Sequence, residues 1–120
     1  MRESREAAHK PEDIARLVAE RANARDAVGL AALYEPNAVL AYPPGSSTVG
    51  RDAIRKVYEQ LLGHAPKFQQ EEAIPTVLCG DLALTSTRSS DNVGVRVQVA
   101  RRQPNGTWLR IIDRPEIPGT

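Results

Sequence analysis

At 120 residues, the chain is long enough for one domain, and its net charge of +1 gives no charge excess that would attract nucleic acid or an anionic membrane. Hydrophobic residues make up 41% and charged residues 26% of the sequence, which argues against disorder. The single cysteine, Cys79, excludes an intrachain disulfide. The polar first ten residues predict no signal peptide, and the absence of a long apolar run predicts no membrane span. We therefore expect a cytoplasmic protein.

The first third of the chain predicts two helices. Pro11, followed by two acidic residues, is typical of a helix start, and apolar residues at helical spacing extend this first helix over about 12–24. Asp26 is placed to cap a second helix, whose apolar stripe runs to Tyr34. Pro36 ends that helix, because proline disfavours the helical state of the residue before it.

A short strand and a third helix follow. The strand is predicted at 38–42, and a loop rich in proline and glycine comes after it. Gly50 opens the third helix, in which apolar residues from Ile54 to Leu62 recur at i, i+3, i+4, i+7 and i+8. This is the clearest amphipathic pattern in the chain, and Gly63 is a natural stop for it.

From Lys67 onward the apolar residues alternate with a period of two, which is typical of strands. Turn signals divide this half of the chain into strands at about 68–79, 82–88, 93–102 and 108–114. Helices grouped early and strands grouped late predict an α+β fold, with three helices on one face of a curved, mostly antiparallel sheet.

Strand parity gives a prediction of which face the helices cover. In each of the last three strands, one of the two sets of alternating residues is wholly aliphatic, and we expect the side chains of this set to face the helices. This set is Leu82, Leu84, Val95, Val97, Val99, Leu109 and Ile111. Trp108 and Ile112 have the opposite parity and are expected on the outer face, where they would form either a partner surface or isolated apolar residues on a solvated sheet.

Three segments resemble a known superfamily. They are DIARLVAERANARDAVGLAALYEPNAVLAY at 13–42, VGRDAI at 49–54 and NGTWLRIID at 105–113. Together they resemble the nuclear transport factor 2-like superfamily, nearest to its SnoaL-like and ketosteroid isomerase-like branches. The resemblance covers a domain at 12–114. The polar segment at 1–11 is predicted to be a flexible tail or a helical extension, and 115–120 a C-terminal tail.

The resemblance implies a cone-shaped, cystatin-like α+β roll with a cavity between the helices and the concave sheet. Members of the superfamily include isomerases, cyclases, epoxide hydrolases and dehydratases, together with domains that have no chemistry, so fold does not settle function. Family members commonly dimerise through the outer sheet face, which implies a homodimer contact at Trp108 and Ile112.

The catalytic residues of ketosteroid isomerase are not reproduced. That mechanism needs a carboxylate base at the end of the first strand, where this chain has Tyr42, and a tyrosine on the first helix, where it has Val18. The aspartate of the oxyanion hole falls near Gln98. Steroid isomerisation by that mechanism is therefore rejected.

A different polar pair is the candidate catalytic site. Asp113 and Arg88 each continue an aliphatic parity, so both are predicted to face the cavity. Asp113 would then act as a general acid or base, and Arg88 would bind an anion or an enolate oxygen. The alternative is a structural ion pair at the strand ends. The predicted ligand contacts are Val18, Tyr34, Tyr42, Tyr58 and Val97, with Tyr42 and Tyr58 supplying hydroxyl donors.

No metal or cofactor is predicted, since paired cysteines, paired histidines and phosphate-binding glycine motifs are missing from the sequence. His9 and His64 are interpreted as solvated or helix-capping residues. These features predict a pocket for a small apolar molecule, which either undergoes cofactor-free isomerisation, cyclisation or hydration or is bound without reaction. A dimeric interaction domain is the third possibility.

Overall fold

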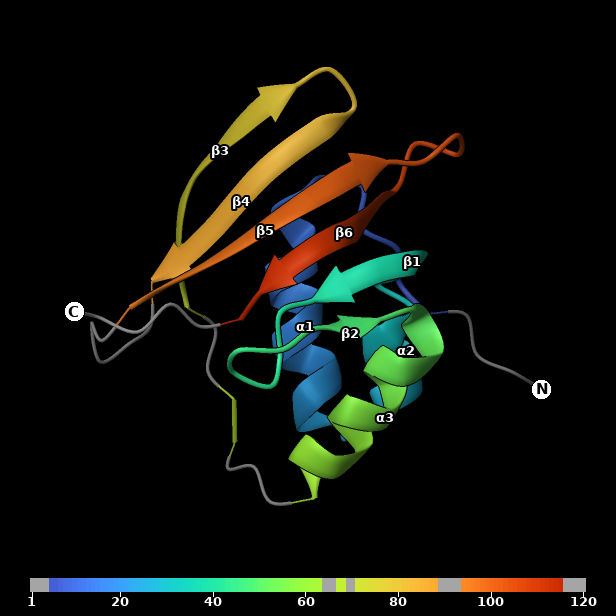
Figure 1. Ribbon diagram of the computed structural model, residues 1–120. Helices are drawn as coiled ribbons and strands as arrows, with labels where there is room; N and C mark the ends of the chain where they lie inside the picture. Colours follow the sequence, from blue (N-terminus) through green and yellow to red (C-terminus); the bar gives the residue numbers. More distant parts are fainter. Residues whose placement is uncertain (1–4, 64–66, 69–70, 89–93, 116–120) are drawn as a thin grey trace.

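The computed structural model describes residues 5–63, 67–68, 71–88 and 94–115 (Figure 1). Its helices are α1 (Asp13–Asn23), α2 (Ala27–Ala31) and α3 (Arg51–Leu62). Its strands are β1 (Tyr34–Leu40), β2 (Thr48–Val49), β3 (Glu72–Cys79), β4 (Leu82–Arg88), β5 (Val95–Arg102) and β6 (Trp108–Arg114). His64, part of two predicted strands, residues 1–4 of the predicted N-terminal tail and residues 116–120 of the predicted C-terminal tail lie outside the described residues.

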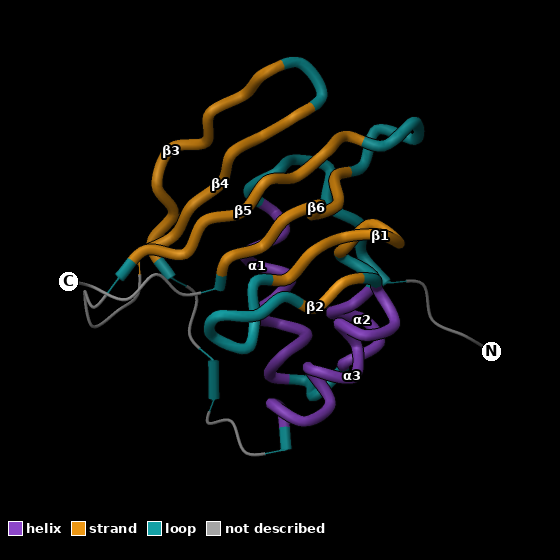
Figure 2. Tube along the Cα trace, viewed as in Figure 1, coloured by secondary structure: helices purple, strands orange, loops and turns teal. Residues whose placement is uncertain are grey.

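The strands form one curved six-stranded sheet in the order β2-β1-β6-β5-β4-β3. β1 and β6 run parallel, and every other neighbouring pair is antiparallel. All three helices lie on one side of this sheet, and the β3–β4 hairpin extends beyond them (Figures 1 and 2). The α+β architecture predicted from the sequence is therefore confirmed. No helix among the described residues is both long and apolar enough to cross a membrane.

Local sequence explains the helix starts. Asp13 accepts hydrogen bonds from the backbone N–H groups of His9 and Lys10, each at 3.2 Å, and so caps the turn that precedes α1. The Asp26 carboxylate accepts from the Gly29 N–H at 2.9 Å, the cap expected for the second helix. At the start of α3, Gly50 has a φ of 99°, a left-handed conformation that glycine adopts without strain.

The second helix is shorter than predicted, and Tyr34 belongs to a strand. α2 ends at Ala31, and Tyr34 begins β1, which ends at Leu40 instead of Tyr42. The cause is tertiary, because Arg110 on β6 donates its backbone N–H to the carbonyl of Leu33 at 2.8 Å and pairs with Tyr34 in the sheet. Pairing with a strand more than 70 residues away overrides a local helical stripe.

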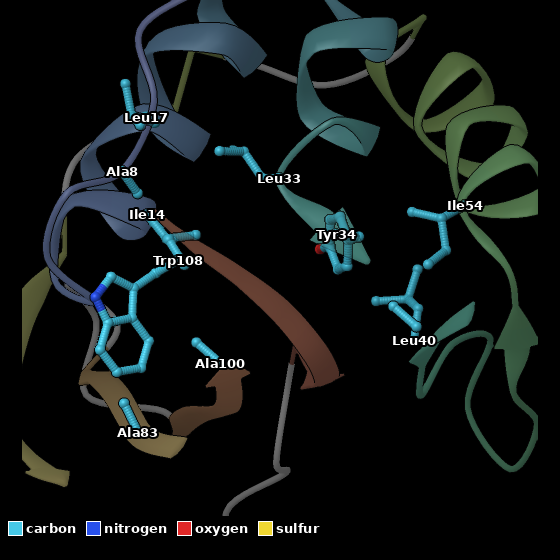
Figure 3. Close-up of a cluster of buried hydrophobic side chains, with 11 residues drawn as sticks. Ala8, Ile14, Leu17, Leu33, Tyr34, Leu40, Ile54, Ala83, Ala100 and Trp108 are labelled. Atoms are coloured by element: carbon cyan, nitrogen blue, oxygen red, sulfur yellow. The ribbon is translucent and has the colours of Figure 1, made fainter. Parts of the chain in front are cut away.

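The core lies between the helices and the inner face of the sheet (Figure 3). Ile14 and Leu17 of α1 and Ile54 of α3 are each at most 2% exposed. Trp108 is only 7% exposed and belongs to the same cluster as Ala83. The prediction that Trp108 lies on the outer face is wrong: small residues on β4 and β5 leave room for the indole on the inner side.

The predicted assignment of the aliphatic parity to the inner face is also wrong. Leu82 and Leu84 are 38% and 43% exposed, whereas Ala83 between them is 1% exposed. On β5, Gln98 and Ala100 are buried while Val97 and Val99, on the other parity, are only partly buried. The inner face therefore carries small and polar side chains, and the outer face carries the aliphatic ones.

A β-bulge in β6 changes the parity of its last residues. Val99 pairs with Ile112, but the next residue, Ala100, pairs with Arg110, so Ile111 is the extra residue. As a result, Arg110 and Asp113 are both buried on the inner face although they are three positions apart. Ile112 is 49% exposed on the outer face.

Residues 5–10, in the segment predicted as a flexible tail, make contacts with the domain. Ala8 is 2% exposed, and its carbonyl accepts from the Trp108 N–H at 2.8 Å. Arg5 forms a salt bridge of 2.8 Å with Asp26. The Arg21 guanidinium is buried and donates to the carbonyls of Glu6 and Gly29, which joins this segment to α1 and α2.

Candidate ligand-binding site

A cavity of about 260 Å³ lies between α1, α3 and the inner face of the sheet. Its walls combine aliphatic and aromatic side chains from the helices with polar side chains from β4, β5 and β6. The lining residues are Ala15, Val18, Ala19, Leu40, Tyr42, Tyr58, Leu61, Phe68, Glu71, Thr87, Arg96, Gln98, Arg110, Asp113 and Pro115. This mixture of an apolar wall and a few convergent polar groups is typical of a small-molecule site.

Four polar side chains form a connected group at the buried end of the site, here called the buried tetrad: Tyr34, Tyr58, Arg110 and Asp113. The Tyr34 hydroxyl donates to Asp113 Oδ2 at 2.5 Å and lies 2.7 Å from the Tyr58 hydroxyl. Arg110 Nη1 lies 3.3 Å from the same Oδ2 atom, and both side chains of this ion pair are at least 94% buried. The tetrad joins β1, α3 and β6.

Two atoms of the tetrad have no hydrogen-bond partner among the described residues. They are Asp113 Oδ1 and Arg110 Nε, an acceptor and a donor, and both are fully buried. Native proteins satisfy nearly all buried polar groups, so each exception calls for an explanation. Because both side chains line the cavity, a bound molecule is a natural partner for these atoms.

Burial sets the ionisation of the tetrad. Desolvation, together with the neighbouring Asp113 charge, raises the pKa of Tyr58 to about 12. The same two causes raise the pKa of Tyr34 well above its usual value. Burial is the largest influence on Arg110 and lowers its pKa, but the neighbouring Asp113, Tyr34 and Tyr58 together outweigh burial and raise it. Both phenols are therefore neutral and the guanidinium is charged near pH 7.

A second polar group lies at the other end of the lining. Arg96 Nε donates to both oxygens of Glu71 at 2.9 Å, and the Thr87 hydroxyl donates to Glu71 at 2.8 Å. Arg96 also donates to the carbonyl of Pro115, which draws the chain after β6 against this edge of the cavity. The Gln98 side chain accepts from Thr85 at 2.7 Å.

The structure brings some of the predicted site residues together. Val18, Tyr42, Tyr58 and Asp113 line the cavity, and Tyr34 reaches it through its hydroxyl contacts with Tyr58 and Asp113. Asp113 faces inward because of the bulge at Ile111 and not because it shares the parity of the aliphatic residues. The prediction that Asp113 faces the cavity therefore rested on an incorrect assignment of the inner residues of the strands.

Arg88 and Val97 do not reach the cavity. Val97 pairs with Ser86 on the outer parity, and Arg88 shares that parity. The Arg88 side chain is 48% exposed and lies 3.5 Å from Glu72, in a surface ion pair. The prediction that these two residues face the helices is wrong, because the whole aliphatic parity was assigned to the inner face.

Sequence reasoning missed Arg110, the cation that pairs with Asp113. A signal was available, since Arg110 has the same parity as Trp108, and a tryptophan is more often buried than exposed. Glu71 and Arg96 were also missed as lining residues; they come together only through the pairing of β3, β4 and β5. Within the described ranges, no three histidine, cysteine or acidic side chains gather as a metal site.

A model of the SnoaL-like domain matches residues 14–114, which is most of the chain. The chain belongs to the SnoaL-like family. This family lies within the nuclear transport factor 2-like superfamily, as the resemblance in the sequence indicated. A search of curated proteins found no match.

Solved structures with the same fold share little sequence with this SnoaL-like chain. A Thiobacillus denitrificans protein, named for the association domain of calcium/calmodulin-dependent protein kinase type II, is 17% identical, with a TM-score of 0.73 over 94% of this chain and 100% of that one. A ketosteroid isomerase-like protein from Erwinia carotovora atroseptica is 19% identical, with a TM-score of 0.71 over 86% and 89%. A proposed dehydratase from Streptomyces avermitilis is 16% identical, with a TM-score of 0.68 over 88% and 93%. These likenesses show the shared cystatin-like α+β fold alone.

Proposed function

We propose that this SnoaL-like protein binds a small, largely apolar metabolite and catalyses a cofactor-independent proton transfer on it, as in an isomerisation, cyclisation or dehydration. The observation that carries the proposal is the Asp113 carboxylate, which is 2% exposed, lines the cavity and has one oxygen without a partner among the described residues. Membership of a superfamily that includes isomerases and a likeness to a proposed dehydratase support the same class of reaction.

The geometry gives each member of the tetrad a part in such a step. Asp113 Oδ1 takes a proton from a carbon next to a carbonyl group; the C–H bond breaks, an O–H bond forms on Asp113, and the electron pair moves to the carbonyl oxygen. Arg110 Nε, a donor without a partner among the described residues, stabilises the resulting enolate. Return of the proton to a different carbon completes an isomerisation. Tyr34 holds the carboxylate through Oδ2.

Hydrogen–deuterium exchange tests this proposal without knowledge of the natural substrate. The probe is 2-tetralone, a neutral bicyclic ketone with acidic C–H groups, incubated with the protein in D₂O and followed by NMR. We expect the protein to accelerate exchange and Asp113→Asn to reduce the acceleration by about 100-fold or more, since positioned general bases contribute about 10²–10⁴-fold. Each variant is assayed below its own melting temperature, with its folded state verified by circular dichroism.

Arg88→Gln is the matched control for that experiment, because Arg88 is a charged residue of the same sheet that lies outside the cavity lining. It is expected to keep the rate of the unsubstituted protein. Exchange that is equally fast with Asp113→Asn would remove Asp113 from the mechanism.

A second candidate function is ligand binding without chemistry. Asp113 Oδ2 already accepts from Tyr34 and pairs with Arg110, so the carboxylate is held by the protein as it would be in a purely structural role. This function predicts that 2-tetralone binds, as measured by calorimetry, but that its exchange in D₂O is not accelerated. Accelerated exchange that depends on Asp113 would contradict it.

We propose in addition that the chain forms a homodimer through the outer face of the sheet. Leu82, Leu84 and Ile112 are exposed there, with exposed fractions of 38–49%. Trp108, predicted as part of this contact, is buried on the inner face and takes no part. Burial of such an aliphatic face against a second copy would stabilise the assembly.

Light scattering after size-exclusion chromatography tests the dimer. The protein is expected to elute as a dimer and Leu84→Lys as a monomer, because the substitution places a charge in the contact. Gln60→Lys, an exposed position on α3, adds the same charge away from the sheet and should remain dimeric. A monomeric unsubstituted protein would overturn the proposal.

A further inference from the structure

The hydrogen bonds of the buried tetrad fix which way its hydroxyl protons point. Arg110 Nη1 lies against Asp113 Oδ2, so Oδ2 is an acceptor, and the Tyr34 hydroxyl donates its only proton to it at 2.5 Å. The 2.7 Å contact between Tyr34 and Tyr58 must then be donated by Tyr58. The single proton of Tyr58 is thus used within the protein, and its oxygen meets a ligand only as an acceptor.

This reverses the sequence-based expectation that Tyr58 supplies a donor. The hydrogen-bonding capacity that the described residues leave unused at the buried end is therefore two acceptors, the Tyr58 oxygen and Asp113 Oδ1, and one donor, Arg110 Nε. All three side chains line the cavity. A ligand group that donates one hydrogen bond and accepts another, such as a hydroxyl, complements this set.

The charges of the lining do not favour an anion. The arginines of the lining are Arg96 and Arg110, and each has a carboxylate partner within the cavity wall: Glu71 at 2.9 Å and Asp113 at 3.3 Å. Among the described lining residues the formal charges cancel. A carboxylate ligand would bring an extra negative charge next to Asp113 or Glu71, with no unpaired cation to balance it.

We propose that the cavity selects a neutral, mainly apolar molecule that carries a hydroxyl group, an alcohol, phenol or enol, with the hydroxyl at the buried tetrad. The volume of about 260 Å³ is slightly below the usual range of about 300–1,000 Å³ and suits a compact ligand. The inference rests on the cavity of the proposed function and specifies its ligand class. An enol is also the form that proton transfer from a ketone would create there.

Three bicyclic aromatic probes of similar size test the proposal by calorimetry at pH 7. They are 2-naphthol, which donates and accepts, 2-methoxynaphthalene, which accepts only, and 2-naphthoate, which is an anion. Hydrogen bonds to charged groups are worth enough that we expect 2-naphthol to bind about 10-fold or more tightly than either of the others. Equal affinity for 2-methoxynaphthalene, tighter binding of 2-naphthoate, or no measurable binding of 2-naphthol at 1 mM, a concentration on the order of a weak-ligand Kd, would overturn it.

Tyr58→Phe removes the acceptor oxygen and leaves the ring in the wall. It should lower the preference for 2-naphthol over 2-methoxynaphthalene by about 3-fold or more, because one of two acceptors is lost. Arg88→Gln, which changes a polar side chain of the same sheet outside the cavity lining, should keep the preference. A preference that is unchanged by Tyr58→Phe would contradict the proposal.

The two proposals fail separately. A hydroxyl preference that depends on Tyr58, without accelerated exchange of 2-tetralone, refutes proton transfer and leaves the ligand class standing. Accelerated exchange with equal affinities for 2-naphthol and 2-methoxynaphthalene refutes the ligand class alone.

Discussion

The inner, buried face of the sheet carries polar side chains, and the outer, exposed face carries aliphatic ones. This is the reverse of what burial alone would suggest. On the inner face, Thr87, Gln98 and Asp113 are each at most 5% exposed, although all three are polar or charged. On the outer face, Leu82 and Leu84 are about two-fifths exposed. These polar side chains form hydrogen bonds with Glu71, Thr85 and Tyr34, respectively, around a cavity, while the aliphatic ones remain at the surface.

This difference shows that the most hydrophobic parity of a strand is not always the core parity. An inner face that must surround a ligand needs polar groups at defined places and small residues elsewhere. An outer face that meets a second protein copy needs continuous aliphatic area. Substitutions at comparable residues on the two faces therefore test whether the inner face is built for a ligand and the outer face for a second protein copy.

The largest difference in stability is expected between the loss of the buried ion pair of Asp113 with Arg110 and the loss of the exposed ion pair of Arg88 with Glu72. Asp113→Ala leaves the Arg110 charge buried without its partner and should cost about 3–5 kcal/mol of unfolding free energy. Arg88→Ala removes an exposed pair with Glu72 and should cost less than about 1 kcal/mol. Urea unfolding measures both, and similar losses would mean that the inner pair is solvated.

A pH dependence specific to the inner face should follow from its phenols. The pKa of Tyr58 is about 12 in the folded protein and about 10 in an unfolded chain, so between these pH values only the unfolded chain releases the proton. The stability that Tyr58 contributes is intact below pH 10 and falls by about 1.4 kcal/mol per pH unit above it. Urea unfolding from pH 8 to 11.5 should show a shallower decline for Tyr58→Phe. An unchanged slope would mean that Tyr58 titrates normally.

The smallest effect is expected from truncation on the outer face. Leu84→Ala, at a position 43% exposed, should cost less than about 1 kcal/mol in the monomer, because little area leaves water there on folding. Leu17→Ala, at a position 2% exposed in the core, should cost about 2–5 kcal/mol. Thermal unfolding at low protein concentration compares the two; a large loss for Leu84→Ala would indicate that the outer face is already covered.

Most of the fold could be predicted because its signals are local. The apolar spacing from Ile54 to Leu62 gave the third helix, and turn residues between alternating segments gave the strands of the antiparallel half. The two-residue strand β2 and the start of β1 at Tyr34 were not predictable in this way. Both depend on hydrogen bonds to distant strands, which local propensity does not contain.

The candidate site was predicted less well than the fold, for two physical reasons. Hydrophobicity cannot identify the inner parity when that parity lines a cavity, and this misplaced Arg88 and Trp108. The bulge at Ile111 then shifted the register, so that Arg110 and Asp113 share a face despite odd spacing. A one-residue shift exchanges the two faces of a strand, and no turn residue marks this one in the sequence.

The parallel pairing of β1 with β6 also bears on how the protein acquires its site during synthesis. Tyr34 and Asp113 are 79 residues apart in the chain, and the hydrogen bond between them closes a loop that includes more than half of it. Contacts of such large sequence separation form late, since the chain must lose the entropy of the whole loop first. A nascent polypeptide on the ribosome would therefore expose the Tyr34 and Tyr58 rings without their carboxylate partner until the final strand emerges, and binding competence would be the last property gained.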